Sequence, residues 1–252
     1  MNVFLYVMLF IMGTFFGSFF TLAVYRIPLG KDITHERSFC PNCNHKLGVL
    51  DLIPVWSYLF LKGKCRYCGE KVRIRYLLLE VISGLFFVLA YASFHIQDIV
   101  LQVVRIPQFI AFIFVYITLV LVGGIDKEYR KINSSILLFG AVCQVIYILY
   151  LYMIEKASVY RYIIYFAIFM ILWMTVRYLE KKKLYGWLEV ILLICYINFA
   201  LGIKVTLLSL GVAVLLLLFS KTKLQRQPLG LIIGISTISC QIVENFIEFW
   251  IK

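Results

Sequence analysis

The sequence has few charged residues. Charged residues make up 15% of its 252 residues, against roughly 25% in an ordinary soluble protein. Hydrophobic residues make up 63%, and the mean hydropathy is +0.93. A soluble core cannot bury so much apolar surface, so lipid must be the solvent for most of the chain. This balance excludes a water-soluble enzyme, a secreted disulfide scaffold and a disordered chain.

Basic residues are also missing ahead of the first apolar stretch, whereas a positively charged loop follows it. We therefore expect a retained membrane span with its N-terminus outside, not a cleaved signal peptide. The sequence shows no internal repeat and no low-complexity tract. Its net charge of +12 reflects basic loops that meet anionic lipid, so we expect the bilayer, and no nucleic acid, as a partner.

Eight apolar stretches predict the fold. They run over 3–25, 77–95, 107–125, 134–154, 158–176, 188–201, 203–220 and 228–250. A spanning helix needs about 20 apolar residues, and the runs lack the alternation of barrel strands. The sixth and seventh stretches are short, so they predict either two short helices with a tight turn or one re-entrant segment. The expected fold class is an all-α polytopic membrane protein with about eight transmembrane helices and a small zinc-knuckle cytoplasmic loop domain.

The distribution of Lys and Arg predicts the orientation. If the loop 26–76 is cytoplasmic, 20 of the 25 Lys and Arg residues lie inside, as the positive-inside rule requires. We expect a multi-pass protein of the inner (cytoplasmic) membrane with its N-terminus outside. The predicted parts are a first transmembrane helix at 1–25, a cytoplasmic domain at 26–76, and a membrane domain of about seven helices at 77–252.

Two Cys-x-x-C pairs stand in the loop, with 21 residues between them. The four cysteines are Cys40, Cys43, Cys65 and Cys68. Two such knuckles can place four thiolates around one zinc ion, and the reducing cytoplasm disfavours disulfides. Four cysteines leave no coordination position for a substrate, so we expect a structural zinc and treat the nearby His45 as a surface residue. Plain free thiols are the alternative.

Two acids are predicted at the cytoplasmic edge of the membrane. Asp126 ends the third span and Glu189 opens the sixth. An acid inside a span costs about 2.5–3.5 kcal/mol, so each requires a reason. Two carboxylates that share a proton can act as base and acid on a water molecule. The alternative is ion pairing, of Asp126 with Lys127 or Arg130 and of Glu189 with the Lys181–Lys183 run.

The loop and its flanks resemble the type IV prepilin leader peptidase family. The matching residues are Gly17-Ser18-Phe19, Arg26, Arg37 to Cys43, Asp51 to Val55, Ser57, Gly63 to Gly69, Arg75-Tyr76, Glu80 and Gly84. Pro228 and Gly230 resemble a further family segment near the C-terminus. The resemblance implies an aspartic peptidase with two catalytic acids, which removes basic leaders from prepilins or pseudopilins at the cytoplasmic face. Many members also methylate the new N-terminus with S-adenosylmethionine, which implies that cofactor as well.

The second acidic motif departs from the family pattern. Asp126 matches the first family acid, but the Gly-x-Gly-Asp motif is represented by Gly186-Trp187-Leu188-Glu189. The proline that follows the first acid in the family is also absent, since Asn133 follows Ile132. A Glu carries out the same acid chemistry as an Asp, with a side chain that is one methylene longer. We therefore expect Asp126 and Glu189 to be the catalytic pair of an aspartic-type prepilin leader peptidase.

Two alternatives follow from the altered motif. In one, the chain lacks peptidase activity and acts only as a methyltransferase, although no glycine-rich nucleotide motif is present. In the other, it is a zinc-stapled, non-enzymatic scaffold for pilin assembly.

Overall fold

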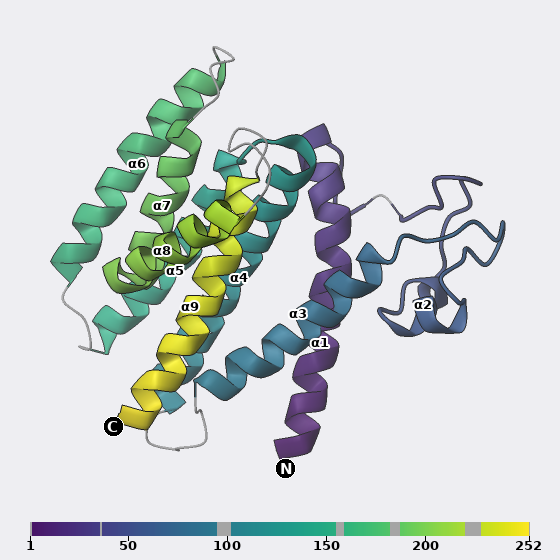
Figure 1. Cartoon of the computed structure of the whole chain (residues 1–252), viewed down its shortest axis with the longest axis horizontal. Helices are drawn as coiled ribbons and strands as arrows, with labels where there is room; N and C mark the ends of the chain where they lie inside the picture. Colours follow the sequence, from purple (N-terminus) through teal and green to yellow (C-terminus); the bar gives the residue numbers. More distant parts are fainter. Residues whose placement is uncertain are drawn as a thin grey trace. The chain divides into compact units, whose positions relative to one another are not determined.

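The computed structural model describes residues 2–35, 37–94, 102–154, 159–181, 187–219 and 228–251. These residues form nine α-helices and two short 3₁₀ helices (Figure 1). Helices α1 to α9 are Asn2–Arg26, Trp56–Phe60, Arg75–Ser93, Gln102–Tyr129, Ser134–Met153, Val159–Lys181, Trp187–Leu201, Ile203–Phe219 and Leu229–Ile251. The 3₁₀ helices are η1 (Ile27–Leu29) and η2 (Val49–Asp51). No strand occurs in the described ranges beyond two isolated β-bridges.

Each of the eight apolar stretches forms a helix, which confirms the predicted all-α membrane fold. Six of these helices, α1, α3, α4, α5, α6 and α9, are long and apolar enough to cross a membrane. Helices α7 and α8 have 15 and 17 residues. They meet at Gly202, whose φ of +89° is a conformation that glycine adopts without steric cost. Of the two alternatives for this region, the structure shows two short helices with a tight turn.

Helix α4 extends beyond both ends of the expected span. Pro107 lies inside it and cannot donate to the carbonyl four residues earlier, which belongs to Val103. The Tyr150 hydroxyl of α5 donates to that carbonyl at 2.6 Å, so the helix continues through the proline. At the other end, α4 runs past Asp126 to Tyr129. Asp126 is therefore a residue of the last helical turn.

The chain divides into two compact units, Met1–Tyr91 and Ala92–Lys252. We call them the N-terminal unit and the C-terminal unit. The N-terminal unit holds α1, most of α3 and the predicted loop domain. Helices α1 and α3 approach closely through glycines: a Cβ on Gly17 would lie 2.7 Å from Glu80 Cα, and one on Gly84 would lie 2.7 Å from the Phe10 ring. Small residues permit such backbone contact between membrane helices.

Two buried or half-buried charged groups join the loop to these helices. Arg26, at the end of α1, donates to the carbonyls of Asp32 at 3.0 Å and Arg37 at 3.3 Å. Glu80 of α3 accepts from the Val55 amide at 2.7 Å. Val55 has a φ of +64°, an unusual conformation for a β-branched residue. Glu80 thus orients the loop domain. Glu80 and Gly17 both belong to the residues that resemble the family.

In the C-terminal unit, α4 packs against α5 and α9, α8 packs against α9, and α6 packs against α7. The largest fully buried side chains include Leu119 and Ile125 of α4, Phe169 of α6, and Leu192 and Tyr196 of α7. The face of α4 that carries this core leads directly to Asp126. The core therefore fixes the helix that presents the first candidate acid.

Candidate active site and zinc site

Asp126 lies in the last turn of α4 and is only 7% exposed. Its Oδ2 accepts a hydrogen bond from the Gly230 amide at 2.7 Å, and the Leu231 amide also donates to the carboxylate. Both amides belong to the first turn of α9, where backbone N–H groups have no partner within the helix. The dipole of α9 also favours a negative charge at this end. The N-terminus of α9 therefore supplies the hydrogen bonds that a buried carboxylate requires.

Gly230 leaves little room for a side chain at this close approach. A Cβ at this position would lie 3.2 Å from Asp126 Oδ2 and 3.4 Å from Ile132 Cγ1. The Asp126 carboxylate would have to move by a few tenths of an ångström to make room. The weak C-terminal resemblance at Pro228 and Gly230 thus identifies a residue that touches the candidate site.

Glu189 lies in the first turn of α7 and is also 7% exposed. Its Oε2 accepts from the Ile132 amide at 3.0 Å, whereas the buried Oε1 has no hydrogen-bond partner among the described residues. Ile132 belongs to the α4–α5 turn, which begins at Arg130 with a φ of +56°. Asn133, at the position after Ile132 where the family has proline, caps α5 by accepting from the Ser135 amide at 3.0 Å.

The structure brings the two predicted acids together. Gly230, whose amide donates to Asp126, lies against Ile132, whose amide donates to Glu189. Arg130 acts on Asp126, and Lys131 on Glu189, as nearby positive charges. The hydrogen bonds to both acids come from backbone amides. The side chains of residues 181–186, which include the lysine run and the motif glycine, lie outside the described part of the chain.

Glu180, near the end of α6, is a site residue that the sequence analysis missed. Its Oε1 accepts from the Ser134 hydroxyl at 3.2 Å and lies 3.9 Å from Lys131 Nζ, while its Oε2 accepts from Arg177 at 2.8 Å. Lys131 lies in the α4–α5 turn that presents an amide to Glu189, and Ser134 directly follows this turn. Glu180, which belongs to α6, therefore stabilises the position of this turn. The feature of the sequence that could have identified Glu180 is its position as an acid at the end of an apolar helix.

The four predicted cysteines form one cluster in the N-terminal unit. Their Sγ atoms all lie within 4.8 Å of one another, and those of Cys40 and Cys68 are 3.8 Å apart. A tetrahedral zinc with Zn–S bonds of about 2.3 Å separates its sulfur ligands by about 3.8 Å. The cluster therefore fits a single metal ion such as zinc, held by Cys40, Cys43, Cys65 and Cys68.

The two knuckles share one backbone fold. In each, the amide of the first cysteine donates to the carbonyl five residues later, and its carbonyl accepts from the amide four residues later, at 2.8 and 3.0 Å. The residue after the second cysteine has a positive φ in both, +56° at Asn44 and +72° at Gly69. This repeated geometry aims both pairs of sulfur atoms at one point.

Asp51 joins the second knuckle to the segment after the first. It accepts from the Gly48 amide at 3.0 Å and the Tyr67 hydroxyl at 3.1 Å, and Arg66 Nε lies 2.7 Å from its other oxygen. Burial opposes its ionisation, but these three donors together hold the pKa of Asp51 below its usual value. The Tyr67 ring lies 3.6 Å from that of His45, so His45 supports the cluster by stacking.

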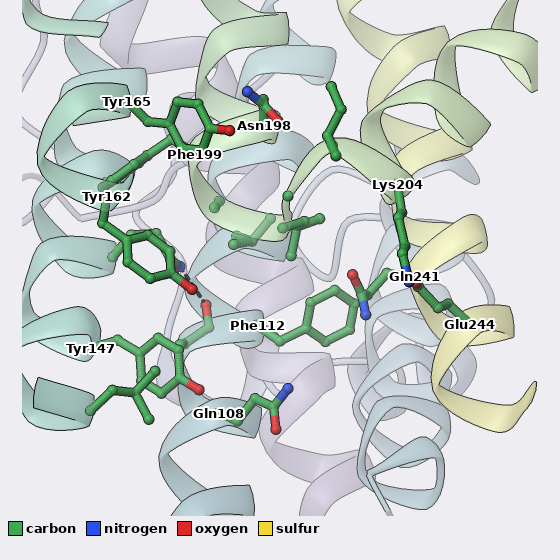
Figure 2. A pocket seen from close by; sticks show the side chains of 18 of the residues that line it. Gln108, Phe112, Tyr147, Tyr162, Tyr165, Asn198, Phe199, Lys204, Gln241 and Glu244 are labelled. Carbon is green, nitrogen blue, oxygen red and sulfur yellow. Dashed lines mark hydrogen bonds between the residues drawn. The ribbon is translucent and has the colours of Figure 1, made fainter. Parts of the chain in front are cut away.

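A cavity of about 370 Å³ lies at the other end of the C-terminal unit (Figure 2). Gln108 lines it, 18 residues before Asp126 on α4, which corresponds to about 27 Å along the helix. Tyr147, Tyr162 and Tyr165 face it from α5 and α6, and Lys204 and Glu244 border it on the opposite side. It contains neither candidate acid.

Residues 11–94 match the family model of the bacterial peptidase A24 N-terminal domain. Three relatives named prepilin leader peptidase/N-methyltransferase illustrate the similarity. The Bacillus subtilis protein is 36% identical over 52% of this chain and 49% of its own length. The Myxococcus xanthus protein is 42% identical over 32% of this chain and 24% of its own length, and the Vibrio cholerae protein 37% identical over 35% and 37%.

These matches confirm the resemblance that the loop motifs indicated, and the family model matches the N-terminal third of the chain. The chain spans half or less of the length of these curated relatives. No solved structure matches it.

Proposed function

We propose that this membrane protein is an aspartic-type leader peptidase for prepilin-like precursors, with Asp126 and Glu189 as its catalytic pair. One observation carries the proposal. Two buried carboxylates, from α4 and α7, accept hydrogen bonds from the backbone amides of Gly230 and Ile132, and these two residues lie against one another. The family match of residues 11–94 independently supports a peptidase that processes prepilins.

The hydrogen bonds support different roles for the two acids. Asp126 accepts from the first amides of α9, and such donors stabilise the charged form of a carboxylate. We assign it the role of base, which removes a proton from the attacking water. Glu189 has one buried oxygen without a partner in the described structure, where a proton can reside. It gives that proton to the departing amine as the scissile C–N bond breaks, and Asp126 retains the proton from water.

The proposed orientation places this pair at the cytoplasmic face, with the N-terminus outside. The precursor would present a basic leader to the cytoplasm while its apolar helix stays in the bilayer. In this arrangement zinc holds the loop domain together through four thiolates and takes no part in hydrolysis.

Leader removal by the full-length chain tests the proposal. The chain is co-expressed with a prepilin-like precursor, and cleavage is followed by mass. Asp126→Asn and Glu189→Gln should each slow cleavage by about 10²–10⁴-fold, the range for loss of general acid–base catalysis. Glu128→Gln, an exposed acid two residues from Asp126, is the matched control and should cleave normally. Unchanged cleavage by Asp126→Asn would refute the proposed pair.

Glu189→Asp tests whether the site is built around the longer acid. The Ile132 amide meets Glu189 Oε2 at 3.0 Å, and an aspartate cannot reach it without a backbone shift. A misplacement of about 1 Å costs on the order of 10²-fold in rate. We therefore expect Glu189→Asp to be slower than the natural enzyme; a faster variant would show that the glutamate is a poorly placed substitute.

Methylation of the new N-terminus is a separate activity, contained in the names of the relatives. Transfer of a labelled methyl group from S-adenosylmethionine to a pre-cleaved precursor tests it. Transfer without any cleavage by the natural chain would favour the methyltransferase alternative. Precursor binding with neither reaction would favour the scaffold.

A further inference from the structure

Helix α2 of the loop domain exposes its apolar side chains. Trp56 is 59% exposed, Leu59 56% and Phe60 78%. These residues are spaced i, i+3 and i+4, so they share one face of the helix. The Trp56 and Phe60 rings stack with centroids 5.9 Å apart. The helix therefore presents a compact aromatic and aliphatic surface.

The polar side of the same helix faces inward. Ser57 and Tyr58 are less exposed than their neighbours, and the Tyr58 hydroxyl donates to the Val72 carbonyl at 3.4 Å. A helix on a water-exposed domain normally has the opposite arrangement. Helix η2, which packs against α2, adds Val49 and Leu50, at 78% and 65% exposed. We call Val49, Leu50, Trp56, Leu59 and Phe60 the apolar patch.

The covalent connections and the charge of the loop domain indicate what covers this patch. The domain is tethered at both ends by membrane-length helices, α1 and α3, so it cannot leave the bilayer surface. Within the N-terminal unit, α2 lies on the side of the domain that faces back along α1 toward its N-terminus (Figure 1). Lipid that surrounds α1 lies on that side. The segment 26–76 also carries 10 Lys and Arg against 4 Asp and Glu, which complements anionic headgroups.

We propose that the apolar patch inserts into the headgroup region of the membrane that α1 and α3 span, as an interfacial anchor for the zinc-binding domain. Trp56 and Phe60 enter the boundary between headgroups and acyl chains, where aromatic residues are favoured. Lys62 and Lys64 follow directly after α2 and contact anionic headgroups. The anchor holds the loop domain flat against the bilayer, and it stands independently of any peptidase activity.

Fluorescence of Trp56 tests this anchor in the full-length protein. The chain is reconstituted into phosphatidylcholine vesicles with or without phosphatidylglycerol, and Trp56→Phe is measured in parallel. The difference between the two samples isolates Trp56 from the other three tryptophans. It should be blue-shifted, quenched by brominated lipid and poorly quenched by aqueous acrylamide. Quenching by acrylamide alone would place the patch in water and overturn the proposal.

If protein, not lipid, covers the apolar patch, the quenching result differs. Protection of Trp56 from both quenchers would mean that protein covers the patch, from this chain, a second copy or a precursor helix, and would also overturn the proposal. Lys62→Gln with Lys64→Gln should reduce the effect of phosphatidylglycerol on lipid quenching. Phe60→Ser should speed tryptic cleavage of the loop, whereas Phe39→Ser, an exposed aromatic outside the patch, should have less effect.

Discussion

The cysteine cluster and the acid pair are assembled in contrasting ways. All four cysteines come from one segment, and the bonds that shape each knuckle span four or five residues. The acid pair depends on contacts across the fold: Gly230 lies 104 residues from Asp126, and Ile132 lies 57 residues from Glu189. In both places backbone hydrogen bonds position the candidate site residues. Only the two knuckles are each organised by local sequence.

This difference has an energetic consequence. The loop domain buries few side chains apart from Cys40 and Cys65, so it has little hydrophobic core of its own. The acid pair sits against a core that extends along α4 and α7. We expect the first site to depend on its metal and the second on helix packing. Four predictions test this contrast.

Zinc removal should have the largest effect and should separate the two regions. Structural zinc contributes on the order of 10 kcal/mol to the folding of small domains. Chelation, or Cys65→Ser, should raise amide hydrogen exchange across 37–74 and leave 102–154 unchanged. Cys143→Ser, which replaces a free cysteine of α5, should keep both the zinc and the exchange pattern. A loop that stays protected without metal would show that the contrast is wrong.

Gly230→Ala perturbs the acid pair at Gly230, the hydrogen-bond partner that lies 104 residues from Asp126 in the sequence. The added Cβ would lie 3.2 Å from Asp126 Oδ2, which requires a shift of a few tenths of an ångström. Since about 1 Å of misplacement costs on the order of 10²-fold, we expect cleavage to slow by about tenfold. The control is Gly211→Ala, because a Cβ at Gly211 meets nothing within 4 Å. Equal rates in the two variants would argue against Gly230 as part of the site.

The same contrast explains how much the sequence could predict. Regular cysteine spacing identified the cluster because its geometry is local. Apolar runs predicted each helix of membrane length among the described residues, whereas the choice between two short helices and a re-entrant segment at Gly202 required the structure. Asp126 and Glu189 were predicted from the sequence as acids at the ends of apolar stretches. Their amide partners could not be found, because every residue has a backbone N–H and only the packing of α9 and the α4–α5 turn selects the ones that donate.

Glu180 tests how far the acid pair depends on the α4–α5 turn. Glu180→Ala removes the bond to Ser134 and the contact with Lys131. A hydrogen bond of about 1 kcal/mol corresponds to about fivefold in rate. We expect kcat to fall by about that factor with KM unchanged, and Glu180→Gln to recover most of it. Arg177→Ala, which leaves the bond to Ser134 intact, should have little effect; equal losses would assign the role to the Arg177 pair instead.

Asp51 provides the smallest test, and it concerns the loop domain alone. Its pKa is held low in the folded protein, so its contribution to stability is complete above the ordinary value of about 3.9 and is lost as the pH falls below it. Asp51→Asn should therefore destabilise the domain at pH 7, by no more than about 1 kcal/mol because Arg66 is partly solvated. The measurement is hydrogen exchange across 48–67, compared between the natural chain and the variant at matched pH. Because acid also releases zinc from both, only the difference between them reports on Asp51. That difference should be constant from pH 7 to 5 and should shrink below pH 4; a difference that grows in acid would contradict the assigned role.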